Sequence, residues 1–356
     1  MPRSEDARSH LVTLTADSKT PGLQYLVVNS DRILFEHCGG WANINRHVSM
    51  KPSTTMTAYS MSKTITAAAV LSLVQTGQVR LDEPLERWVP DSPYGPGIVV
   101  SQLLTHTSGM PNPLPLRWIH RPDQHQTFDE AAALESVLKG HPRLSHSPGT
   151  KYRYSNIGYW LLGRVVEAAS GEPFTRYVDQ HVLAPLGIEA GQLGYEIPDT
   201  SRHATGYLEK YSLMNLVKRF LLDRDLIGTY EGRWLRINSH YLNGPAFGGL
   251  VGTANGFATF LQDQLRQHSR LLEDAIRDQF YAPQQTAQGT PIPMTLGWHV
   301  GDLHGRRFFY KEGGGAGFHC MMRLYRAEGV ASVIMANATG FDVKDCLNRV
   351  DQGFLH

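Results

Sequence analysis

Cysteine is scarce in this chain of 356 residues. Its three cysteines, Cys38, Cys320 and Cys346, are odd in number, far apart and nowhere spaced as Cys-x-x-Cys. This argues against the disulfide framework of small secreted domains and against a zinc site built on cysteine. The 16 histidines contain no His-x-x-x-His pair either, so no metal ligand set is expected.

Excess charge and long apolar runs are also lacking. The 34 basic and 33 acidic residues leave a net charge of +1, so no global field attracts nucleic acid, and no nucleic-acid partner is expected. No stretch approaches the ~18 apolar residues of a spanning helix, and the polar amino terminus shows no signal peptide. We therefore expect a cytoplasmic protein without a transmembrane segment, although a shortened form of an exported protein would give the same pattern.

What the sequence does contain is a sizeable apolar fraction, with strand-like segments near both ends. Hydrophobic residues make up 41% of the chain, enough for one large domain or two closely packed ones. Strands are predicted within 22–36, around a turn at 29–31, and then at 308–311, 317–325 and 330–336. Helices are predicted at about 60–75, 161–169 and 342–353, and helices broken by proline and glycine loops fill residues 85–283.

This distribution predicts one sheet assembled from both ends of the chain, together with a second, mainly helical lobe. The expected division is a discontinuous α/β domain at 1–84 and 284–356 and a helical lobe at 85–283. A groove between two lobes is the default place for an active site.

A serine and a lysine lie where a loop enters the first long helix, in Tyr59-Ser60-Met61-Ser62-Lys63. Residues three apart on a helix share a face, so the Lys63 amine can reach the Ser60 hydroxyl. A serine hydroxyl is a weak nucleophile unless a base takes its proton, and a lysine can be that base when burial or nearby positive charge lowers its pKa. The spacing alone also fits a helix cap, and Ser136 and Lys139 repeat it in a stretch predicted to be a solvated helix face.

Further segments accompany this pair in a fixed order: Leu-Leu-Thr-His-Thr-Ser-Gly at 103–109, Pro-Gly-Thr-Lys-Tyr-Arg-Tyr-Ser-Asn at 148–156 with Leu-Leu-Gly at 161–163, Gly-Pro-Ala-Phe-Gly-Gly-Leu-Val at 244–251, and Lys-Glu-Gly-Gly at 311–314. In this order the chain resembles the β-lactamase-related serine hydrolases. That superfamily includes class C β-lactamases, D-alanyl-D-alanine peptidases, D-aminopeptidases and family VIII carboxylesterases. The resemblance implies an α+β, β-lactamase/transpeptidase-like fold, with an antiparallel sheet built from both chain ends, flanking helices and a mainly helical lobe.

The resemblance also implies roles for two pairs of residues. Ser60 and Lys63 match the family's Ser-x-x-Lys pair, and Tyr154 and Asn156 match its Tyr-x-Asn element. In that element the phenol works with the lysine as general base and then as general acid to the leaving group. The amide holds a substrate carbonyl or the lysine. The same spacing at 241–243 lacks the Pro-Gly lead-in and the Leu-Leu-Gly that follows, and is interpreted as structural.

A third element, Lys311-Glu312-Gly313, matches the Lys-Thr-Gly or His-x-Gly strand of relatives. In a strand Lys311 and Gly313 share a face. There Lys311 would bind a substrate carboxylate and lower the pKa of the lysine base, Gly313 would leave room for substrate, and the Gly314 amide would complete an oxyanion hole with the Ser60 amide. Glu312 replaces the usual threonine or serine; we expect it to pair with Lys311 and weaken carboxylate recognition, which argues against β-lactam hydrolysis.

Other features receive mainly structural interpretations. His106 is expected to anchor a loop. The apolar stretch at 213–222 is expected to pack on the helical lobe, with a membrane contact or a lid as alternatives. Tyr207, Tyr230 and Trp234 are hypothesised to shape a pocket for an apolar acyl or alcohol group. No Gly-x-Ser-x-Gly occurs, which argues against an α/β-hydrolase.

The predicted activity is hydrolysis of a small-molecule ester or amide through an acyl-serine, with no metal or organic cofactor. Carboxylesterase action on small or medium acyl esters is the first choice, because peptidases and lactamases of this kind act outside the cytoplasm and no export signal is visible. β-Lactamase and D-amino-acid peptidase or amidase activities stay open because Lys311 is retained. A non-catalytic ligand-binding member of the fold is the alternative from another class, and the oligomeric state is left open.

Overall fold

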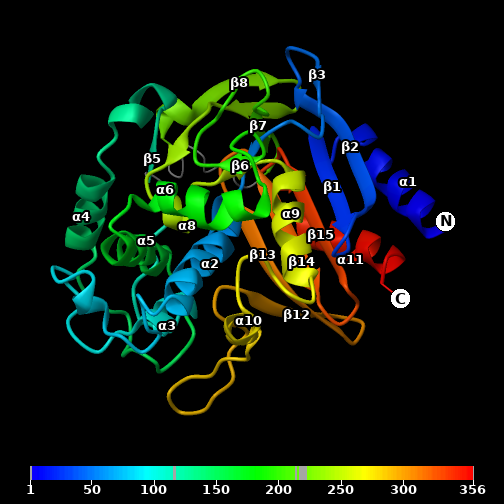
Figure 1. Cartoon of the computed structure of the whole chain (residues 1–356). Helices are drawn as coiled ribbons and strands as arrows, with labels where there is room; N and C mark the ends of the chain where they lie inside the picture. The colour runs from blue at the N-terminus through cyan, green and yellow to red at the C-terminus, as the bar shows by residue number, and fades with distance from the viewer. Residues whose placement is uncertain (1, 115–117, 213–214, 216–222, 356) are drawn as a thin grey trace.

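The computed structural model describes residues 2–114, 118–212, 215 and 223–355, and it is organised around one large sheet (Figure 1). Strands from the amino-terminal end, drawn in blue, lie beside strands from the carboxyl-terminal end, drawn in orange and red. All neighbours pair antiparallel, in the order β12 (His299–Leu303), β13 (Arg306–Gly314), β14 (His319–Tyr325), β15 (Val330–Ala336), β1 (Gly22–Val28), β2 (Ile33–Asn43) and β3 (Val48–Ser49). The predicted α+β fold with an antiparallel sheet from both chain ends is confirmed.

Both faces of the central strands are buried, which explains why most of their residues are apolar. On β15, Val333 and Met335 point into one core, whereas Ile334 and Ala336 point into the other. Such alternation follows from the two-residue period of a strand. The pairing of β1 with β15 runs in register from Leu23 opposite Ala336 to Val28 opposite Ala331, so the two chain ends are joined along their length.

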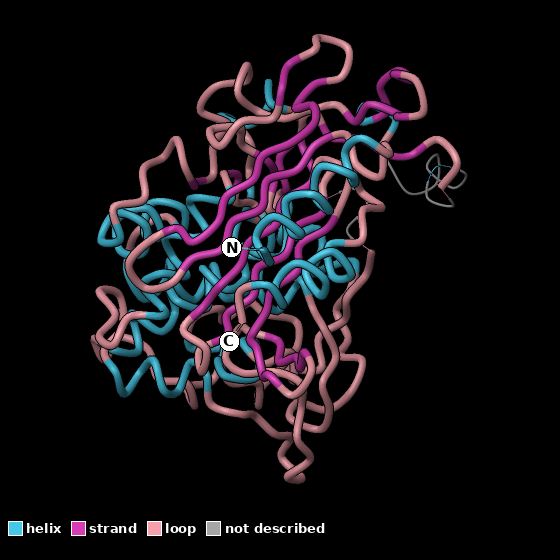
Figure 2. Tube along the Cα trace, turned by 90° about the vertical axis from the view of Figure 1, so that its right-hand side faces the viewer, coloured by secondary structure: helices cyan, strands magenta, loops and turns pink. Residues whose placement is uncertain are grey.

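Two terminal helices, α1 (Pro2–Ala16) and α11 (Val343–Val350), cover one face of the sheet, as Figure 2 shows from that side. Leu11 of α1 and Leu347 of α11 reach the core on this face together with Tyr25 of β1. The helix α1 was not predicted, because its sequence is largely polar and only a few positions are buried. The predicted helix at 342–353 is confirmed as α11 followed by the short turn η7 (Asp351–Gly353).

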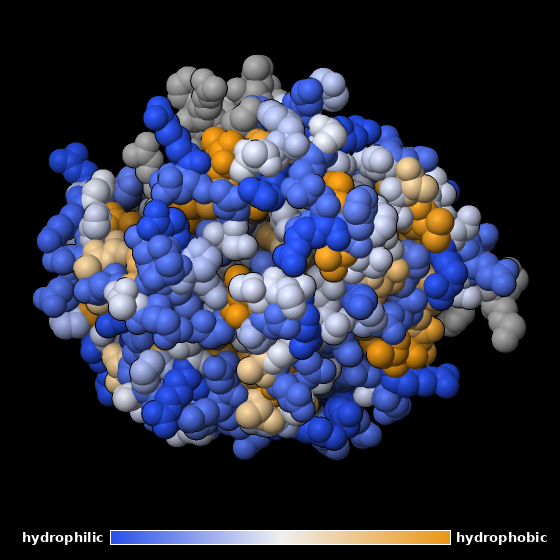
Figure 3. All heavy atoms as spheres, turned by 90° about the horizontal axis from the view of Figure 1, so that it is seen from above, coloured by the Kyte–Doolittle hydropathy of each residue, from blue (hydrophilic) through white to orange (hydrophobic). Residues whose placement is uncertain are grey.

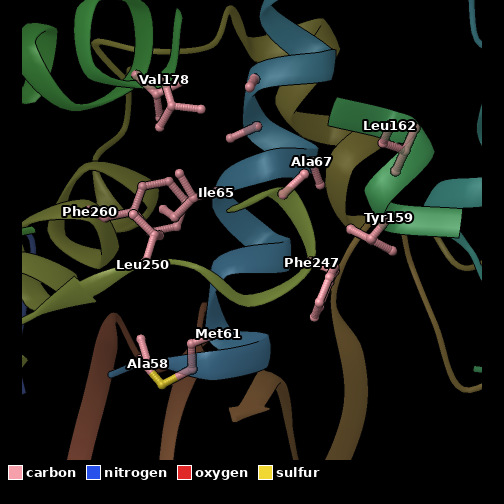
Figure 4. Close-up of a cluster of buried hydrophobic side chains, with 14 of the residues drawn as sticks. Ala58, Met61, Ile65, Ala67, Tyr159, Leu162, Val178, Phe247, Leu250 and Phe260 are labelled. Carbon is pink, nitrogen blue, oxygen red and sulfur yellow. The ribbon is translucent and has the colours of Figure 1, made fainter. Parts of the chain in front are cut away.

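The opposite face carries α9 (Ala254–Leu265), which packs against β1 and β15, and α2 (Ser62–Gln75), which adjoins β13. Helix α2 is buried on all sides, as expected for a helix that is apolar all round. Figure 4 shows it between two groups of side chains: Phe260, Leu250 and Val178 on one side, and Tyr159, Leu162 and Phe247 on the other. The turn that contains Ser60 therefore leads directly into a helix that is buried on all sides.

The remaining elements lie mostly between residues 85 and 283. The helices are α3 (Val100–Leu104), α4 (Glu130–Gly140), α5 (Asn156–Ser170), α6 (Phe174–Val178), α8 (Pro245–Gly248) and α10 (Asp274–Tyr281). Short strands form three small sheets, β5 (Ile119–His120) with β10 (Tyr241–Leu242), β4 (Met56–Thr57) with β11 (Val251–Gly252) and β6 (Leu193–Gly194), and β7 (Gly206–Glu209) with β9 (Trp234–Ile237) and β8 (Ile227–Glu231). Short turns are η1 (Tyr59–Met61), η2 (Leu85–Arg87), η3 (Pro122–Thr127), η4 (Asp179–Leu183), η5 (Ala184–Leu186) and η6 (Arg224–Leu226).

The division at residues 84/85 and 283/284 stays a prediction. Helix α9 falls within the range assigned to the helical lobe, yet it packs on the main sheet. The range 85–283 also holds two of the small sheets and two strands of the third, whose β4 lies outside it, so its helical character is only partial.

The surface seen from above in Figure 3 is predominantly hydrophilic, with hydrophobic residues in separate patches. Within the described residues, no helix is long and apolar enough to cross a membrane. The apolar stretch predicted at 213–222 lies outside the described residues except for Asn215. The pocket hypothesis for Tyr207 and Trp234 is wrong, because both side chains belong to the core beneath α1 and α11.

Candidate active site

Ser60 lies in the turn η1, directly before α2, and is partly exposed. The turn depends on Tyr59, whose φ of 47° lies in the left-handed region that side chains rarely adopt. Buried hydrogen bonds hold this conformation: the Ala58 amide donates to the Leu250 carbonyl at 2.9 Å, and the Tyr59 hydroxyl donates to the Ala316 carbonyl at 2.7 Å. Backbone strain that the surroundings impose is typical of functional sites.

The Lys63 amine lies one helical turn beyond and is completely buried. Its Nζ donates to three acceptors: Ser60 Oγ at 3.0 Å, Asn156 Oδ1 at 2.7 Å and the Phe247 carbonyl at 2.6 Å. Burial, and then the positive charge of Lys311, lower the pKa of Lys63 well below its ordinary value. Of the two roles expected for Asn156, the structure shows the contact with the lysine.

Tyr154 approaches Ser60 from the segment just before α5. Its hydroxyl donates to Ser60 Oγ at 2.8 Å. Burial raises the pKa of Tyr154, so the phenol keeps its proton at neutral pH. Ser60 Oγ therefore accepts hydrogen bonds from both groups that the sequence analysis assigned to proton transfer.

The Tyr-x-Asn element is held by the start of α5 and by the loop at 103–109. Ser155 caps α5, its Oγ accepting from the Gly158 amide at 3.1 Å. The Ser155 amide donates to His106 Nδ1 at 3.1 Å, and the His106 ring packs against Tyr154 with centroids 4.3 Å apart. His106 thus lies where the sequence analysis expects it, as a buried support for this loop, and burial lowers its pKa well below the usual value.

Lys311 is buried as completely as Lys63. Its Nζ lies 5.7 Å from the Tyr154 ring centroid and 5.5 Å from that of Tyr159, and it has no hydrogen-bond partner among the described residues. Burial lowers the pKa of Lys311 to about 7. Because the side chain has no exposed surface, it does not line an open groove as the sequence analysis expects.

The expected pairing of Glu312 with Lys311 is wrong. Glu312 Oε1 lies 2.7 Å from His319 Nε2 instead, on the opposite face of β13. Neighbouring residues of a strand point to opposite faces, so a carboxylate next to Lys311 in sequence turns away from it.

The end of β13 lies directly against the nucleophile turn. A Cβ atom added to Gly313 would stand 2.1 Å from the Ala58 carbonyl oxygen and 3.0 Å from the Ser60 nitrogen, so only glycine fits. The Gly315 amide donates to the Phe318 carbonyl of the β13–β14 hairpin at 3.1 Å. Amide directions alternate along an antiparallel strand, so the Gly314 amide points away from β14.

Two contacts were missed by the sequence analysis. The Phe247 carbonyl on Lys63 is a backbone group, for which no residue-type signal exists. Tyr59 stands beside Ser60 in the sequence. Its hydrogen bond to the Ala316 carbonyl could not be predicted, because it depends on the turn between β13 and β14 lying next to η1.

The two repeated spacings are structural, as predicted. Lys139 forms an exposed ion pair with Glu135 on α4, and Asn243 contacts His120 at 3.0 Å. Neither copy brings its pair of side chains to Ser60.

The described residues contain no group of three or more histidine, cysteine, aspartate or glutamate side chains arranged to hold a metal ion. The site brings together the Ser60 hydroxyl, the two adjacent groups that can carry its proton, Lys63 and Tyr154, and the backbone at the end of β13. That set of groups is suited to acyl transfer.

Comparison with known proteins gives the family. A family model described as Beta-lactamase matches residues 7–352. The chain belongs to this Beta-lactamase family. Members of the family are serine hydrolases of the β-lactamase fold, so the resemblance read from the sequence is confirmed.

Named relatives are distant. Penicillin-binding protein 4* of Bacillus subtilis (strain 168) is 24% identical over 332 residues, which cover 90% of this chain and 70% of the relative. Protein flp of Staphylococcus aureus (strain MW2) is 27% identical over 171 residues, 47% of this chain and only 33% of the relative. The crystal structure of D-amino acid amidase from Ochrobactrum anthropi SV3 complexed with L-phenylalanine amide superposes with a TM-score of 0.82 at 20% identity, covering 98% of each chain. At this identity the superposition establishes the shared β-lactamase/transpeptidase-like fold.

Proposed function

We propose that this protein hydrolyses small or medium acyl esters through an acyl-serine at Ser60. The observation that carries the proposal is the convergence of the Lys63 amine and the Tyr154 hydroxyl on Ser60 Oγ, at 3.0 and 2.8 Å. Both groups are within the reach that proton transfer requires.

The acceptors around Lys63 support its role as the base. The Asn156 and Phe247 oxygens are carbonyl oxygens, which only accept, so each takes one N–H of the amine. When the amine loses its third proton, the lone pair points along the remaining direction, toward Ser60 Oγ. The lowered pKa of Lys63 makes that neutral form accessible.

The reaction then follows from these positions. Ser60 Oγ attacks the ester carbonyl as its proton passes to Lys63, and the Ser60 and Gly314 amides stabilise the oxyanion. Each such donor contributes about 3–4 kcal/mol to the transition state. Tyr154 protonates the departing alcohol and recovers its proton through Lys63. Water then attacks the acyl-serine, releasing the carboxylic acid and restoring the serine.

One feature favours neutral esters over substrates that carry a carboxylate. Lys311, the group expected to bind such a carboxylate, is fully buried. β-Lactams and peptides ending in a free carboxylate would therefore lack their expected cationic partner.

Amidase action on amino-acid amides is the second candidate. The superposition with D-amino acid amidase over 98% of both chains is compatible with this, although it bears on fold alone.

The proposal is tested by labelling with a fluorophosphonate probe, which reacts with activated serines. We expect one adduct, located at Ser60 by peptide mass spectrometry, and none in Ser60→Ala or Lys63→Ala variants whose circular dichroism matches that of the native chain. Absence of labelling in the native chain would favour the non-catalytic ligand-binding alternative.

The substrate class is tested by comparing p-nitrophenyl butyrate, D-phenylalanine amide and nitrocefin under identical conditions. Ester hydrolysis with little nitrocefin turnover is expected. A kcat/KM for the amide above that for the ester would establish the second candidate instead.

A further inference from the structure

Glu312 and His319 join the two strands of the β13–β14 hairpin next to the nucleophile turn. Glu312 Oε1 lies 2.7 Å from His319 Nε2, and the other ring nitrogen, Nδ1, lies 2.6 Å from the Phe341 carbonyl oxygen. The side chains are 43% and 20% exposed. We call this pair, with the Phe341 carbonyl, the hairpin clamp.

The acceptors around His319 determine how many protons the hairpin clamp holds. A carbonyl oxygen only accepts, so Nδ1 must carry a hydrogen. An ionised carboxylate also only accepts, so the contact of Glu312 with Nε2 requires a second proton, carried by either partner. The pair is therefore complete only while it shares this proton; without it, two lone pairs face each other at 2.7 Å.

The hairpin clamp lies against the residue proposed to donate to the oxyanion. His319 is opposite Gly314 in the register of the hairpin. A Cβ atom on Gly314 would stand 3.1 Å from Cδ2 of the imidazole, so the ring lies directly over this glycine. Farther along the turn, the Ala316 carbonyl accepts from Tyr59 and the Gly317 amide donates to Thr339 Oγ1, each at 2.7 Å. At Gly314, the three heavy atoms nearest to such a Cβ atom all belong to the His319 ring.

We propose that Glu312 and His319 are positioning residues that hold the Gly314 amide in place for the reaction, and that they do so only while they share a proton. The inference rests on the proposed function. Its consequence is a fall in turnover at alkaline pH, as the pair loses the shared proton and the side-chain bond between Glu312 on β13 and His319 on β14 is lost.

Other titratable groups surround the pair. Tyr310 on the same face of β13, Cys320 on β14 and Tyr154 across the site all feel the charge of Glu312, and burial raises the pKa of each. They keep their protons where a histidine titrates. Asp342, next to Phe341, caps α11 by accepting from the Asp345 amide. Lys311, on the opposite face of β13, has its pKa lowered by burial to about 7, so the experiment must separate its titration from that of the clamp.

The Glu312→Gln variant makes this separation. A glutamine amide donates to neutral Nε2 while Nδ1–H still donates to the Phe341 carbonyl, so the hairpin clamp is complete without a shared proton. Lys311 and Lys63 are untouched by the change. The matched control is Glu135→Gln, an exposed glutamate on α4.

The measurement is kcat for p-nitrophenyl butyrate from about pH 6 to about pH 9, across the histidine range, with spontaneous hydrolysis subtracted. We expect kcat of the native chain and of Glu135→Gln to fall about tenfold on the alkaline side. This is less than the roughly 100-fold or larger fall in kcat that follows complete removal of an oxyanion donor, because the Gly314 amide is displaced but still present. Glu312→Gln keeps its alkaline kcat, and His319→Leu is slow at every pH. Coincident profiles for the native chain and Glu312→Gln would overturn the proposal.

Two further readouts keep this result separate from the proposed function. Fluorophosphonate labelling of Ser60 shows whether the serine is reactive at all. The ¹⁵N chemical shifts of the His319 ring, followed with pH, report the proton directly, without catalysis. A ring that holds a single proton throughout, with Glu312 ionised, would refute the hairpin clamp even if labelling succeeds.

Discussion

Lys63 and Lys311 share one buried space: their amines lie 4.9 and 5.7 Å from the centroid of the same ring, that of Tyr154. Neither side chain has exposed surface. Burial and the charge of Lys311 together lower the pKa of Lys63. The second lysine thus helps to lower the pKa of the first, although its own side chain has no contact with solvent.

Replacing Lys311 by methionine should shift the rising limb of the pH–activity profile to higher pH. The substitution removes the positive charge that opposes protonation of Lys63, so the pKa of Lys63 rises. The measurement is kcat/KM for p-nitrophenyl butyrate as a function of pH. Lys139→Met, which removes an exposed lysine on α4, should leave the limb in place. An unchanged limb in Lys311→Met would mean that the two amines are not coupled.

The same variant should be more stable than the native chain, with the largest gain in acidic solution. Folding lowers the pKa of Lys311 from 10.5 to about 7, so the unfolded chain binds the additional proton between these values. The burial penalty is fully present below about pH 7 and disappears as the pH rises toward 10.5. Thermal unfolding at several pH values should show a gain in Tm that decreases as the pH rises. A gain independent of pH would point to packing instead.

Changing Asn156 to aspartate should abolish activity at neutral pH while retaining the fold. The side chains are nearly equal in size, but the new carboxylate would lie at the 2.7 Å position now held by Oδ1. A negative charge there stabilises the ammonium form of Lys63 and raises its pKa. Labelling of Ser60 should therefore require a higher pH than in the native chain. Asn156→Ala, which adds no charge, should lose less activity at neutral pH.

The substitution Gly313→Ala should push the end of β13 away from the turn η1 that contains Ser60. A Cβ atom there would overlap the Ala58 carbonyl oxygen at 2.1 Å, so β13 must move away from η1. We expect a loss of about 1–3 kcal/mol in the free energy of unfolding and a larger proportional loss of kcat. Gly140→Ala is the control, since a methyl group there meets nothing within 4 Å. Native activity in Gly313→Ala would show that close contact between β13 and η1 is not required.

The sequence predicted well those strands whose both faces are buried. β1, β14 and β15 are rich in apolar residues, with only one or two polar residues each, a pattern that needs no knowledge of the partner strand. β12 was missed because His-Val-Gly-Asp-Leu is mixed in character, and pairing with β13 is what makes it a strand. The true extent of β13, through Gly314, depends likewise on its pairing with β14.

Glu312 shows the limit of predicting contacts from neighbouring positions. Its charge suggested a pair with Lys311, but strand geometry sends the two side chains to opposite faces. The actual partner, His319, is seven residues away and lies diagonally across a hairpin. The charge of Glu312 correctly indicated that it forms an ion pair, whereas the identity of its partner depended on the register of the β13–β14 hairpin.

By itself, the sequence determined which groups share a face within one element: the Ser60 hydroxyl and the Lys63 amine on one helical turn, and Lys311 with Gly313 on one strand. These relations follow from the local periods of helix and strand. Only the tertiary structure decided that Tyr154 reaches Ser60 across 94 positions, and that α5 covers Lys311. Both depend on how separate elements pack, and packing is a property of the whole core rather than of any one segment.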